Sequence, residues 1–373
     1  MIKILYILDN VSKVAGVTTI VYGLYKNMNK ELFQSDFLVS RRVENSYEDE
    51  ILKMGGKVFY SGNPLSVKEI IGACRYNKEF FRRHASEYDI VYLHSPTIAE
   101  MTIRYAKQYG VKNIIIHSHS SMFSPNLIKR FINNLLVFRI RKLANHFWYC
   151  SKEAAEFLYG KDFKALPDSQ WVKNAIDCDK FSFDRIASLE MRKNLLMEKY
   201  KIALHVSNFS KIKNTSFLID VIDKVTSIDK EWRFIFVGDG PERVNTENEI
   251  KRKGLEEYCL FLGFRNDVQS FMNAADLLLL PSLKEGLPIV TIEAQALGLK
   301  CFVTDTITHD ADIGNVEYLR LVSEIWAEKI LSFNPSGMDE RERFSSIVKN
   351  GDFNIINETK NIEKLYQKIA MEK

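Results

Sequence analysis

The sequence predicts two α/β domains, each built on a parallel sheet with helices on both faces. The chain has 373 residues, a length that suits two domains better than one. Short apolar, β-rich runs alternate with helical patterns, which is typical of parallel sheets buried on both faces. The alternation weakens over the polar residues 177–198 and then restarts, which indicates a second sheet of the same kind.

The first half of the chain contains six predicted strands with helical patterns between them. The strands are expected at Lys3–Leu8, Phe37–Val39, Lys57–Tyr60, Ile90–Leu93, Asn113–Ile116 and His146–Tyr149. The helices are expected at Thr18–Met28, Glu48–Met54, Val67–Ala85 and Thr97–Tyr109. We assign residues 1–185 to this N-terminal, Rossmann-like domain.

The second half repeats the pattern over residues 186–350, the predicted C-terminal Rossmann-like domain. Its strands are expected at Ile202–Val206, Arg233–Val237, Cys259–Phe261, Leu277–Leu280 and Lys300–Val303. Its helices are expected at Thr215–Ser227, Glu242–Lys253, Val268–Ala274 and Thr291–Gly298. In the tail, 351–373, apolar residues at helical spacing predict a helix that could dock on either domain, including back on the first. Two open parallel sheets in tandem bind ligands beyond the carboxyl ends of their strands.

Composition excludes some classes of protein. Lys and Arg number 52 against 48 Asp and Glu, a formal charge of +4, which is too balanced to indicate nucleic-acid binding. The five cysteines are scattered without zinc-site spacing and suggest a reducing compartment. No signal-peptide pattern and no apolar run of membrane-spanning length is present, so we expect a cytoplasmic protein.

The most informative segment is 279–294, where a buried strand is followed by a short loop and a predicted helix starting near Pro288. A proline suits the first turn of a helix, and the free N–H groups there favour a phosphate. Glu285 and Glu293 flank this start and are better suited to accept hydrogen bonds from sugar hydroxyls. Two solvated glutamates would be the simpler interpretation of the pair alone, but the surrounding strand, Gly-Leu-Pro loop and helix favour a site.

Histidines follow two strands of the first half. His117 and His119 lie on one side of the chain if the strand continues, and His94 ends the preceding strand. Ordinary polar loop residues would explain a lone histidine. A metal site needs a third ligand at a suitable spacing, and we identify none in the sequence.

A basic amphipathic segment covers residues 126–148, in which lysines and arginines alternate with large apolar residues. Such a helix can lie on an anionic membrane surface or pack on the core with a solvated basic face. Phe80, Phe81, Arg82 and Arg83 are candidates to extend the same patch.

Taken together and in order, these motifs resemble the family-4 retaining glycosyltransferases of the GT-B fold, especially their bacterial capsule and exopolysaccharide branch. The resemblance covers roughly residues 1–330. It rests on the EGLP…E stretch from Glu285 to Glu293 and on Gly16-Val17, His117–Ser120, Cys150–Lys152, Asn174–Asp177, Lys213-Asn214, Val237–Pro241 and Phe261–Phe264. We read Val237–Pro241 as a tight turn after a strand, without a phosphate role.

The resemblance implies a role for each matching residue. Glu285 would contact the hydroxyls of the transferred sugar, and Glu293 the ribose hydroxyls of the nucleotide. The diphosphate would bind the cation Lys213 and the backbone of Gly286 and Leu287. Phe264 and Arg265 would lie beside the base of the nucleotide. His119 would lie beside the transferred sugar, with His117 as the second candidate. Gly16 would stand at a helix start that binds an anion.

Two positions depart from the family pattern. Asn208 stands where the family usually has an arginine facing the diphosphate, and asparagine can hydrogen-bond to phosphate but cannot neutralise it. Ala15 stands where the family usually has the first of two glycines. Loss of the cation would cost several kcal/mol of leaving-group stabilisation, on the order of other electrostatic contributions of this type.

The resemblance therefore implies a hexosyl- or N-acetylhexosaminyltransferase that retains the anomeric configuration. It would move a sugar from a nucleotide diphosphate, UDP being expected, to a glycan or lipid-linked hydroxyl in surface polysaccharide synthesis. No metal and no cofactor are expected, and the 126–148 segment would hold the enzyme at the inner membrane face. A non-catalytic accessory subunit and a sugar-nucleotide epimerase of the same fold are the alternatives.

Overall fold

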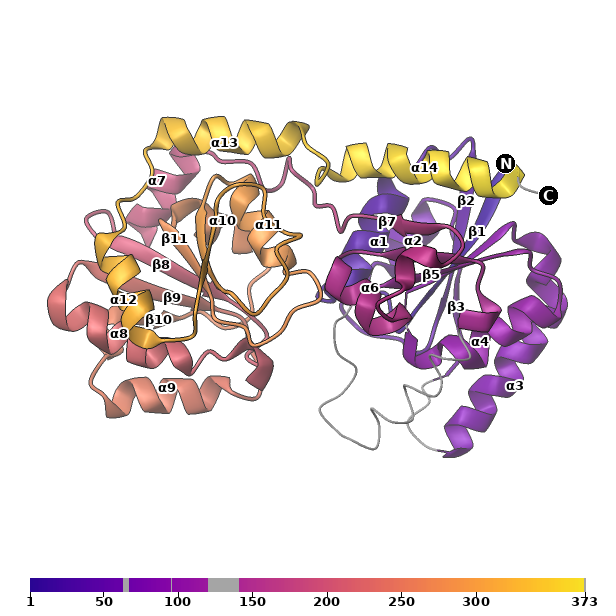
Figure 1. Cartoon of the computed structure of the whole chain (residues 1–373), viewed down its shortest axis with the longest axis horizontal. Coiled ribbons are helices and arrows are strands. Elements are labelled where there is room, and N and C mark those ends of the chain that lie inside the picture. Colours follow the sequence, from indigo (N-terminus) through magenta and orange to yellow (C-terminus); the bar gives the residue numbers. More distant parts are fainter. Residues whose placement is uncertain (63–66, 95, 120–140, 372–373) are drawn as a thin grey trace. The chain divides into compact units, whose positions relative to one another are not determined.

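The chain folds into two units, each built on its own parallel sheet. A computed structural model describes residues 1–62, 67–94, 96–119 and 141–371. The first unit comprises Met1–Ala175 and Ile355–Lys373, and the second comprises Ile176–Asn354 (Figure 1). The sequence predicts the domain boundary at residue 186, ten residues later than the structure has it. Residues 176–185 belong to the second unit because the backbone N–H of Ile176 donates to Phe353 (2.9 Å) and that of Phe183 donates to the Ser345 hydroxyl (3.2 Å).

The first unit is a parallel sheet with helices packed against it. Its strands are β1 Ile2–Leu8, β2 Phe33–Val39, β3 Val58–Tyr60, β4 Ile90–Leu93, β5 Asn113–Ser118, β6 His146–Tyr149 and β7 Ser169–Trp171. Its helices are α1 Gly16–Asn27, α2 Glu48–Lys53, α3 Val67–His84, α4 Pro96–Gln108, α6 Lys152–Tyr159 and α14 Ile355–Met371, with short 3₁₀ turns η1 Ala85–Glu87 and η2 Phe163–Ala165. Helix α14, at the end of the chain, packs against α1 and β1.

The order of strands in this sheet decides which loops meet. Among the described residues the order is β3-β2-β1-β4-β5-β6-β7, and every pairing is parallel. β4 and β5 are neighbours, and their register places Leu93 opposite Ile116. The residues that follow, His94 and His117, therefore leave the same edge of the sheet side by side.

The second unit repeats this architecture. Its strands are β8 Lys201–Val206, β9 Trp232–Val237, β10 Cys259–Phe261, β11 Leu277–Leu280, β12 Lys300–Thr304 and β13 Val316–Leu319. Its helices are α7 Arg185–Asn194, α8 Phe217–Ile228, α9 Arg243–Arg252, α10 Val268–Ala274, α11 Ile289–Ala296, α12 Ser323–Ser332 and α13 Met338–Asn350, with 3₁₀ turns η3 Lys211–Lys213 and η4 Glu256–Tyr258.

In the second sheet the described strands run β10-β9-β8-β11-β12-β13, again all parallel. β8 and β11 lie side by side in the middle, so the loops after them share one edge of the sheet. The four leucines of β11 are at most 1% exposed, as expected for a central strand covered on both faces. The fold thus confirms two parallel-sheet α/β domains.

Candidate functional site

The strand–loop–helix segment singled out in the sequence is formed by β11 and α11. Pro288 is the residue immediately before the helix, and Leu287 is buried beside it, which anchors the loop. Within the described residues no side chain caps this helix start, and its first turn carries no acidic residue. Its backbone N–H groups and the positive end of its dipole therefore suit an anion.

Lys213 and Glu285, predicted separately as site residues, form an ion pair. The Lys213 Nζ lies 2.5 Å from Glu285 Oε1, and both side chains are largely buried. The two loops are held together by a backbone hydrogen bond from Leu283 to Ile212 (2.8 Å) and by the Asn214 amide, which donates to the Pro281 carbonyl (3.3 Å). The structure therefore brings the predicted phosphate cation and the predicted sugar carboxylate to one point.

Glu293 lies on α11, one helical turn beyond its start, and is half-buried. Burial raises the pKa of its carboxyl group to about 7, and the positive charge of Lys180 opposes this shift. A carboxyl group that titrates near neutral pH is characteristic of functional sites. Glu293 is thus suited to bind hydroxyls in a pH-dependent way.

Gln295, which the sequence analysis did not identify, holds α11 in place. Its buried amide donates to the carbonyl of Ala311 (2.8 Å) and accepts from the backbone N–H of Ile313 (2.8 Å). It also donates to Thr291 within the helix (3.0 Å). The available signal was a glutamine on a mostly apolar helix, because a buried amide needs hydrogen-bond partners.

Asn208 is bonded within its own loop. Its Oδ1 accepts hydrogen bonds from the backbone N–H (3.3 Å) and the hydroxyl (2.9 Å) of Ser210. The next residue, Phe209, is buried and has a positive φ of 43°. The side chain that replaces the family arginine therefore shapes the loop between β8 and η3.

The turn after β9 packs tightly against that loop. Gly238 and Gly240 have φ values of 122° and 158°, and a Cβ atom on either would lie 1.8 Å from the carbonyl oxygen of Ser207 or Asn208. Only glycine fits these two positions. The turn thus serves to position residues 207–209.

Phe264 and Arg265 follow β10. The ring of Phe264 is 52% exposed, so it is available to stack on a flat group. Arg265 forms a two-point ion pair with Asp267, at 2.8 and 2.7 Å. A role for Arg265 toward a nucleotide base would have to compete with this pair.

In the first unit, Gly16 is the first residue of α1 and is exposed. Ala15 precedes the helix, and among the described residues no side chain caps this start. The Thr18 hydroxyl, within the first turn, donates to the Asn10 carbonyl (3.0 Å). A helix start of this kind is compatible with an anion but does not specify one.

The histidines of the first unit meet in a compact cluster, which we call the histidine cluster: His94, His117 and His119. One possible ligand nitrogen from each lies within 4.8 Å of the other two. His94 and His117 are buried, and His119 is half-buried. The ring centroids of His117 and His119 are 3.9 Å apart.

Hydrogen bonds set the orientation of each ring. His119 Nδ1 lies 3.1 Å from Asn174 Oδ1, an acceptor, so this nitrogen carries the proton. His119 Nε2 then accepts from His94 Nδ1 at 2.8 Å. His117 Nδ1 pairs with the hydroxyl of Tyr92 at 2.7 Å.

The cluster is held in its uncharged form. Burial lowers the pKa of His119 to about 4, against a raising effect of its bond to Asn174. Burial also lowers the pKa of His94 and His117 well below the ordinary histidine value, and the neighbouring rings lower it further. Neutral imidazole keeps a lone pair on one nitrogen, the form that binds metals and accepts protons.

The structure corrects one sequence-based conclusion. Spacing in the sequence indicates no third ligand beside His117 and His119, but the structure places His94 next to them, in a group of three that could hold a metal ion. The reason is the parallel register of β4 and β5, which brings together residues 23 positions apart. Spacing along the chain cannot reveal such a pair before the strand order is known.

The predicted membrane segment is tested only in part. Residues 126–140 of the predicted 126–148 segment lie outside the described residues. Its last three residues, 146–148, belong to strand β6 of the sheet. The proposed extension through Phe80 and Phe81 is wrong, because both rings are buried in the core of the first unit. Arg82 and Arg83 are both paired with Glu79 on the same helix. None of the described helices is long and apolar enough to cross a membrane.

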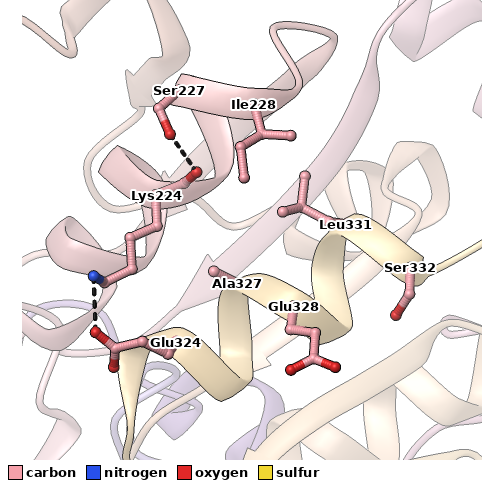
Figure 2. A pocket seen from close by; sticks show the side chains of 8 residues that line it. All are labelled: Lys224, Ser227, Ile228, Glu324, Ala327, Glu328, Leu331 and Ser332. Atoms are coloured by element: carbon pink, nitrogen blue, oxygen red, sulfur yellow. Dashed lines mark hydrogen bonds and ion pairs between the residues drawn. The ribbon is translucent and has the colours of Figure 1, made fainter.

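A groove on the second unit, between α8 and α12, contains none of the predicted site residues. It has a volume of about 650 Å³ and is lined by Lys224, Ser227, Ile228, Glu324, Ala327, Glu328, Leu331 and Ser332. Figure 2 shows the Lys224–Glu324 ion pair (2.8 Å) at one end and apolar side chains between the helices. Lys224 is the one lysine among these lining residues, and it is already paired with Glu324. The groove is therefore a poor match for a sugar diphosphate.

Known proteins share this arrangement. Crystal structures of Anabaena Alr3699/HepE in complex with UDP and with UDP-glucose superpose with a TM-score of 0.76 at 16% identity. They cover 98% and 99% of this chain and all of the other. The two parallel-sheet domains therefore form a GT-B fold of the glycosyltransferase type.

Sequence comparison gives the family. Residues 188–314 match the family described as glycosyl transferases group 1. EpsF of Bacillus subtilis (strain 168), a glycosyltransferase by name, is 31% identical over 354 residues, 91% of this chain and 90% of the relative. An Escherichia coli protein named UDP-Gal:alpha-D-GlcNAc-diphosphoundecaprenol alpha-1,3-galactosyltransferase is 24% identical over 230 residues, 59% of this chain and 58% of that one. The chain belongs to the group 1 glycosyltransferases.

Proposed function

We propose that this chain is a retaining hexosyl- or N-acetylhexosaminyltransferase that uses a UDP-sugar, with its nucleotide-sugar site in the second unit. The observation that carries the proposal is the Lys213–Glu285 ion pair (2.5 Å). Glu285 lies on the loop that leads to the start of α11, and Lys213 ends η3, which is hydrogen-bonded to that loop. A cation, a helix start and a carboxylate are what a diphosphate and a sugar hydroxyl need. The UDP complexes of the structural neighbour support UDP as the nucleotide.

The chemistry follows from these groups. Lys213 and the start of α11 would stabilise the negative charge that develops on the leaving diphosphate. Glu285, released from Lys213 as the phosphate takes its place, would accept hydrogen bonds from the sugar. Glu293 would accept from the ribose hydroxyls and orient the nucleotide. The transfer is expected to need no metal ion at the diphosphate and to proceed by attack from the face that the leaving group occupies.

The acceptor is proposed from the relatives. The Escherichia coli relative is named for a sugar linked to diphosphoundecaprenol, so we propose a lipid-linked or growing glycan hydroxyl, in the synthesis of a surface polysaccharide such as a capsule. The basic segment 126–148 would place the enzyme on the membrane that carries this acceptor. Vesicle flotation with and without anionic lipid tests this part separately, because it does not depend on turnover.

His119 is proposed to act beside the transferred sugar, as the family resemblance implies. Both of its ring nitrogens are engaged, with Asn174 and His94. A sugar contact would therefore replace one of these two bonds. Replacing His119 with alanine should lower kcat more than it raises KM if the contact forms mainly in the transition state.

The test is a turnover assay with a panel of UDP-sugars and a polyprenyl-diphosphate glycan acceptor, followed by NMR of the product. One UDP-sugar should support transfer, with an α-linked product from an α-linked substrate. Glu285→Gln should reduce kcat, while Glu257→Gln, a surface change in the same unit, should not. Transfer by the parent that is unaffected by Glu285→Gln, or inversion at the anomeric carbon, would contradict the proposal.

A second function, a non-catalytic subunit, is favoured by one observation. Asn208 replaces a cation and is bonded to Ser210 in its own loop, so part of the expected phosphate charge is missing. If UDP bound only to an Asn208→Arg variant and no UDP-sugar were consumed by the parent, this alternative would replace the first.

A further inference from the structure

The histidine cluster contains two buried nitrogen atoms that have no hydrogen-bond partner among the described residues. They are His94 Nε2 and His117 Nε2, in side chains at most 4% exposed. Only His117 Nε2 would face the ion, since His94 meets His119 through Nδ1. Leaving a buried polar atom without a partner is energetically costly, because the atom has lost its hydrogen bonds to water. Such atoms in a native structure usually indicate a bound ion or another missing partner.

The other nitrogens of the cluster are already oriented by neighbours. The hydroxyl of Tyr92 holds Nδ1 of His117, and the amide oxygen of Asn174 holds Nδ1 of His119. This leaves Nε2 of His117 for a further ligand, and Nε2 of His119 becomes available when its hydrogen bond to His94 Nδ1 is replaced. Metal-binding histidines are typically held in this way, by a hydrogen bond on the nitrogen that does not face the metal.

The spacing is close to that of a metal site. A tetrahedral ion with ligand distances of about 2.0–2.1 Å would hold its nitrogens roughly 3.4 Å apart. In the cluster His94 Nδ1 and His119 Nε2 are 2.8 Å apart, and one possible ligand nitrogen of each of the three rings lies within 4.8 Å of the other two. The rings need to separate slightly, with the His94–His119 hydrogen bond replaced by two bonds to the ion.

The ligand type limits the choice of ion. Imidazole nitrogens suit zinc, copper, iron and nickel, whereas magnesium and calcium prefer oxygen. His119 is half-buried, so solvent can supply a fourth ligand on that side. The cluster lies at the carboxyl edge of β4 and β5 in the first unit, whereas the residues proposed to bind the diphosphate belong to the second unit.

From this geometry we propose that His94, His117 and His119 form a binding site for a transition-metal ion of the zinc class. Tyr92 and Asn174 orient two of the ligands. Metal binding can be measured without any glycosyl transfer, so the two proposals are tested separately. Because His119 cannot hold the ion and contact the sugar at the same time, a bound ion inhibits transfer.

The experiment uses full-length, tag-free protein from which metal has been removed by chelation. Cobalt(II) is added first, and the visible absorption of a tetrahedral site is recorded; zinc binding is then measured by calorimetry. One equivalent should bind. His117→Gln and His119→Gln should weaken binding more than about 100-fold, and Tyr92→Phe and Asn174→Ala by about 10- to 100-fold, the range for residues that orient ligands.

Two controls keep the result interpretable. His309→Gln, whose ring stacks on Tyr318 in the second unit, should leave metal affinity unchanged. Thermal unfolding of each metal-free variant shows whether it is folded, and His119→Gln, at the half-buried position, is the variant best tolerated. Absence of stoichiometric binding by the parent, or binding that survives His119→Gln in a folded protein, overturns the proposal.

Discussion

Glu293 is the single residue whose protonation should connect pH to nucleotide binding. Burial raises the pKa of its carboxyl group to about 7, so the group gains its negative charge as the pH rises through neutrality. Ribose hydroxyls donate more strongly to the charged form. We therefore expect UDP affinity to rise roughly fivefold between pH 6 and pH 8, equivalent to about 1 kcal/mol.

The matched variant for this prediction is Glu293→Gln. Glutamine keeps the shape of the side chain but does not titrate, so the ratio of parent to variant affinity isolates Glu293 from the titration of UDP itself. Calorimetry across the pH range measures this ratio. A ratio that is constant with pH, or that falls as the pH rises, would contradict the role given to Glu293.

Asn208 offers a gain-of-function test at the same scale. An arginine there would add a cation facing the expected phosphate, and hydrogen bonds that involve charged groups are about twice as strong as neutral ones. Asn208→Arg should therefore tighten UDP binding about tenfold. The control is Asn208→Gln, which also removes the hydrogen bond to the Ser210 hydroxyl but adds no charge, so it should not tighten UDP binding. An equal gain in UDP affinity from both variants would refute the electrostatic explanation.

At the scale of elements, Arg341 of α13 holds two helix ends in place. Its buried guanidinium donates to the carbonyls of Met272, Asn273 and Ala275 at the end of α10 and to Leu297 after α11. Burial lowers its pKa to about 9, so it remains charged at neutral pH. Because α11 carries Glu293, this residue also supports the proposed site.

Arg341→Met should therefore be strongly destabilising. It leaves buried carbonyls without donors, and we expect a loss of at least about 3 kcal/mol in the free energy of unfolding. Denaturant unfolding of the variant measures the loss. Arg343→Met, on the exposed face of the same helix, should change stability by no more than about 0.5 kcal/mol, and similar effects from both would show that the carbonyl contacts are unimportant.

Most central strands could be predicted from the sequence, because both of their faces are buried and their residues are apolar. β2 was predicted too short, at Phe37–Val39 instead of Phe33–Val39, because it contains Asp36. That carboxylate is fully buried and accepts from the Tyr88 hydroxyl and the Lys57 backbone, both at 2.9 Å. A partner 52 residues away is invisible in a local pattern.

The edge strands β7 and β13 were missed for a different reason. β7 has the sequence Ser-Gln-Trp and pairs on one side only, with β6, and β13 pairs only with β12 among the described strands. A strand that is covered less fully need not be apolar. In the candidate site, the strand–loop–helix structure of residues 279–294 could be predicted because these residues are contiguous, whereas the histidine cluster depends on strand order.

At the scale of the whole molecule, the chain returns at its end to the unit where it began. Tyr366 of α14 is fully buried, its hydroxyl lies 3.1 Å from that of Tyr6, and its ring stacks on Trp148. The first unit therefore depends on the last helix for part of its core. Amphipathic spacing in the tail predicted the helix but left open which domain it covers.

Removing this side chain tests that dependence. Tyr366→Ala should cost about 3–5 kcal/mol, the range for losing a buried aromatic side chain, and should lower the unfolding temperature of the first unit. Met371→Ala, at a residue that is 77% exposed in the same helix, is the control and should have little effect. Equal stability of both variants would show that α14 does not contribute to the core.

The most direct test of the central claim is calorimetric titration of the parent, Lys213→Ala and Glu293→Ala with UDP. The claim is that the second unit holds a nucleotide-diphosphate site at the start of α11. It predicts one UDP bound per chain by the parent and at least about tenfold weaker binding by each variant, while Glu249→Ala on the surface helix α9 binds like the parent. No UDP binding by the parent, or binding that neither Lys213→Ala nor Glu293→Ala weakens, would contradict the claim.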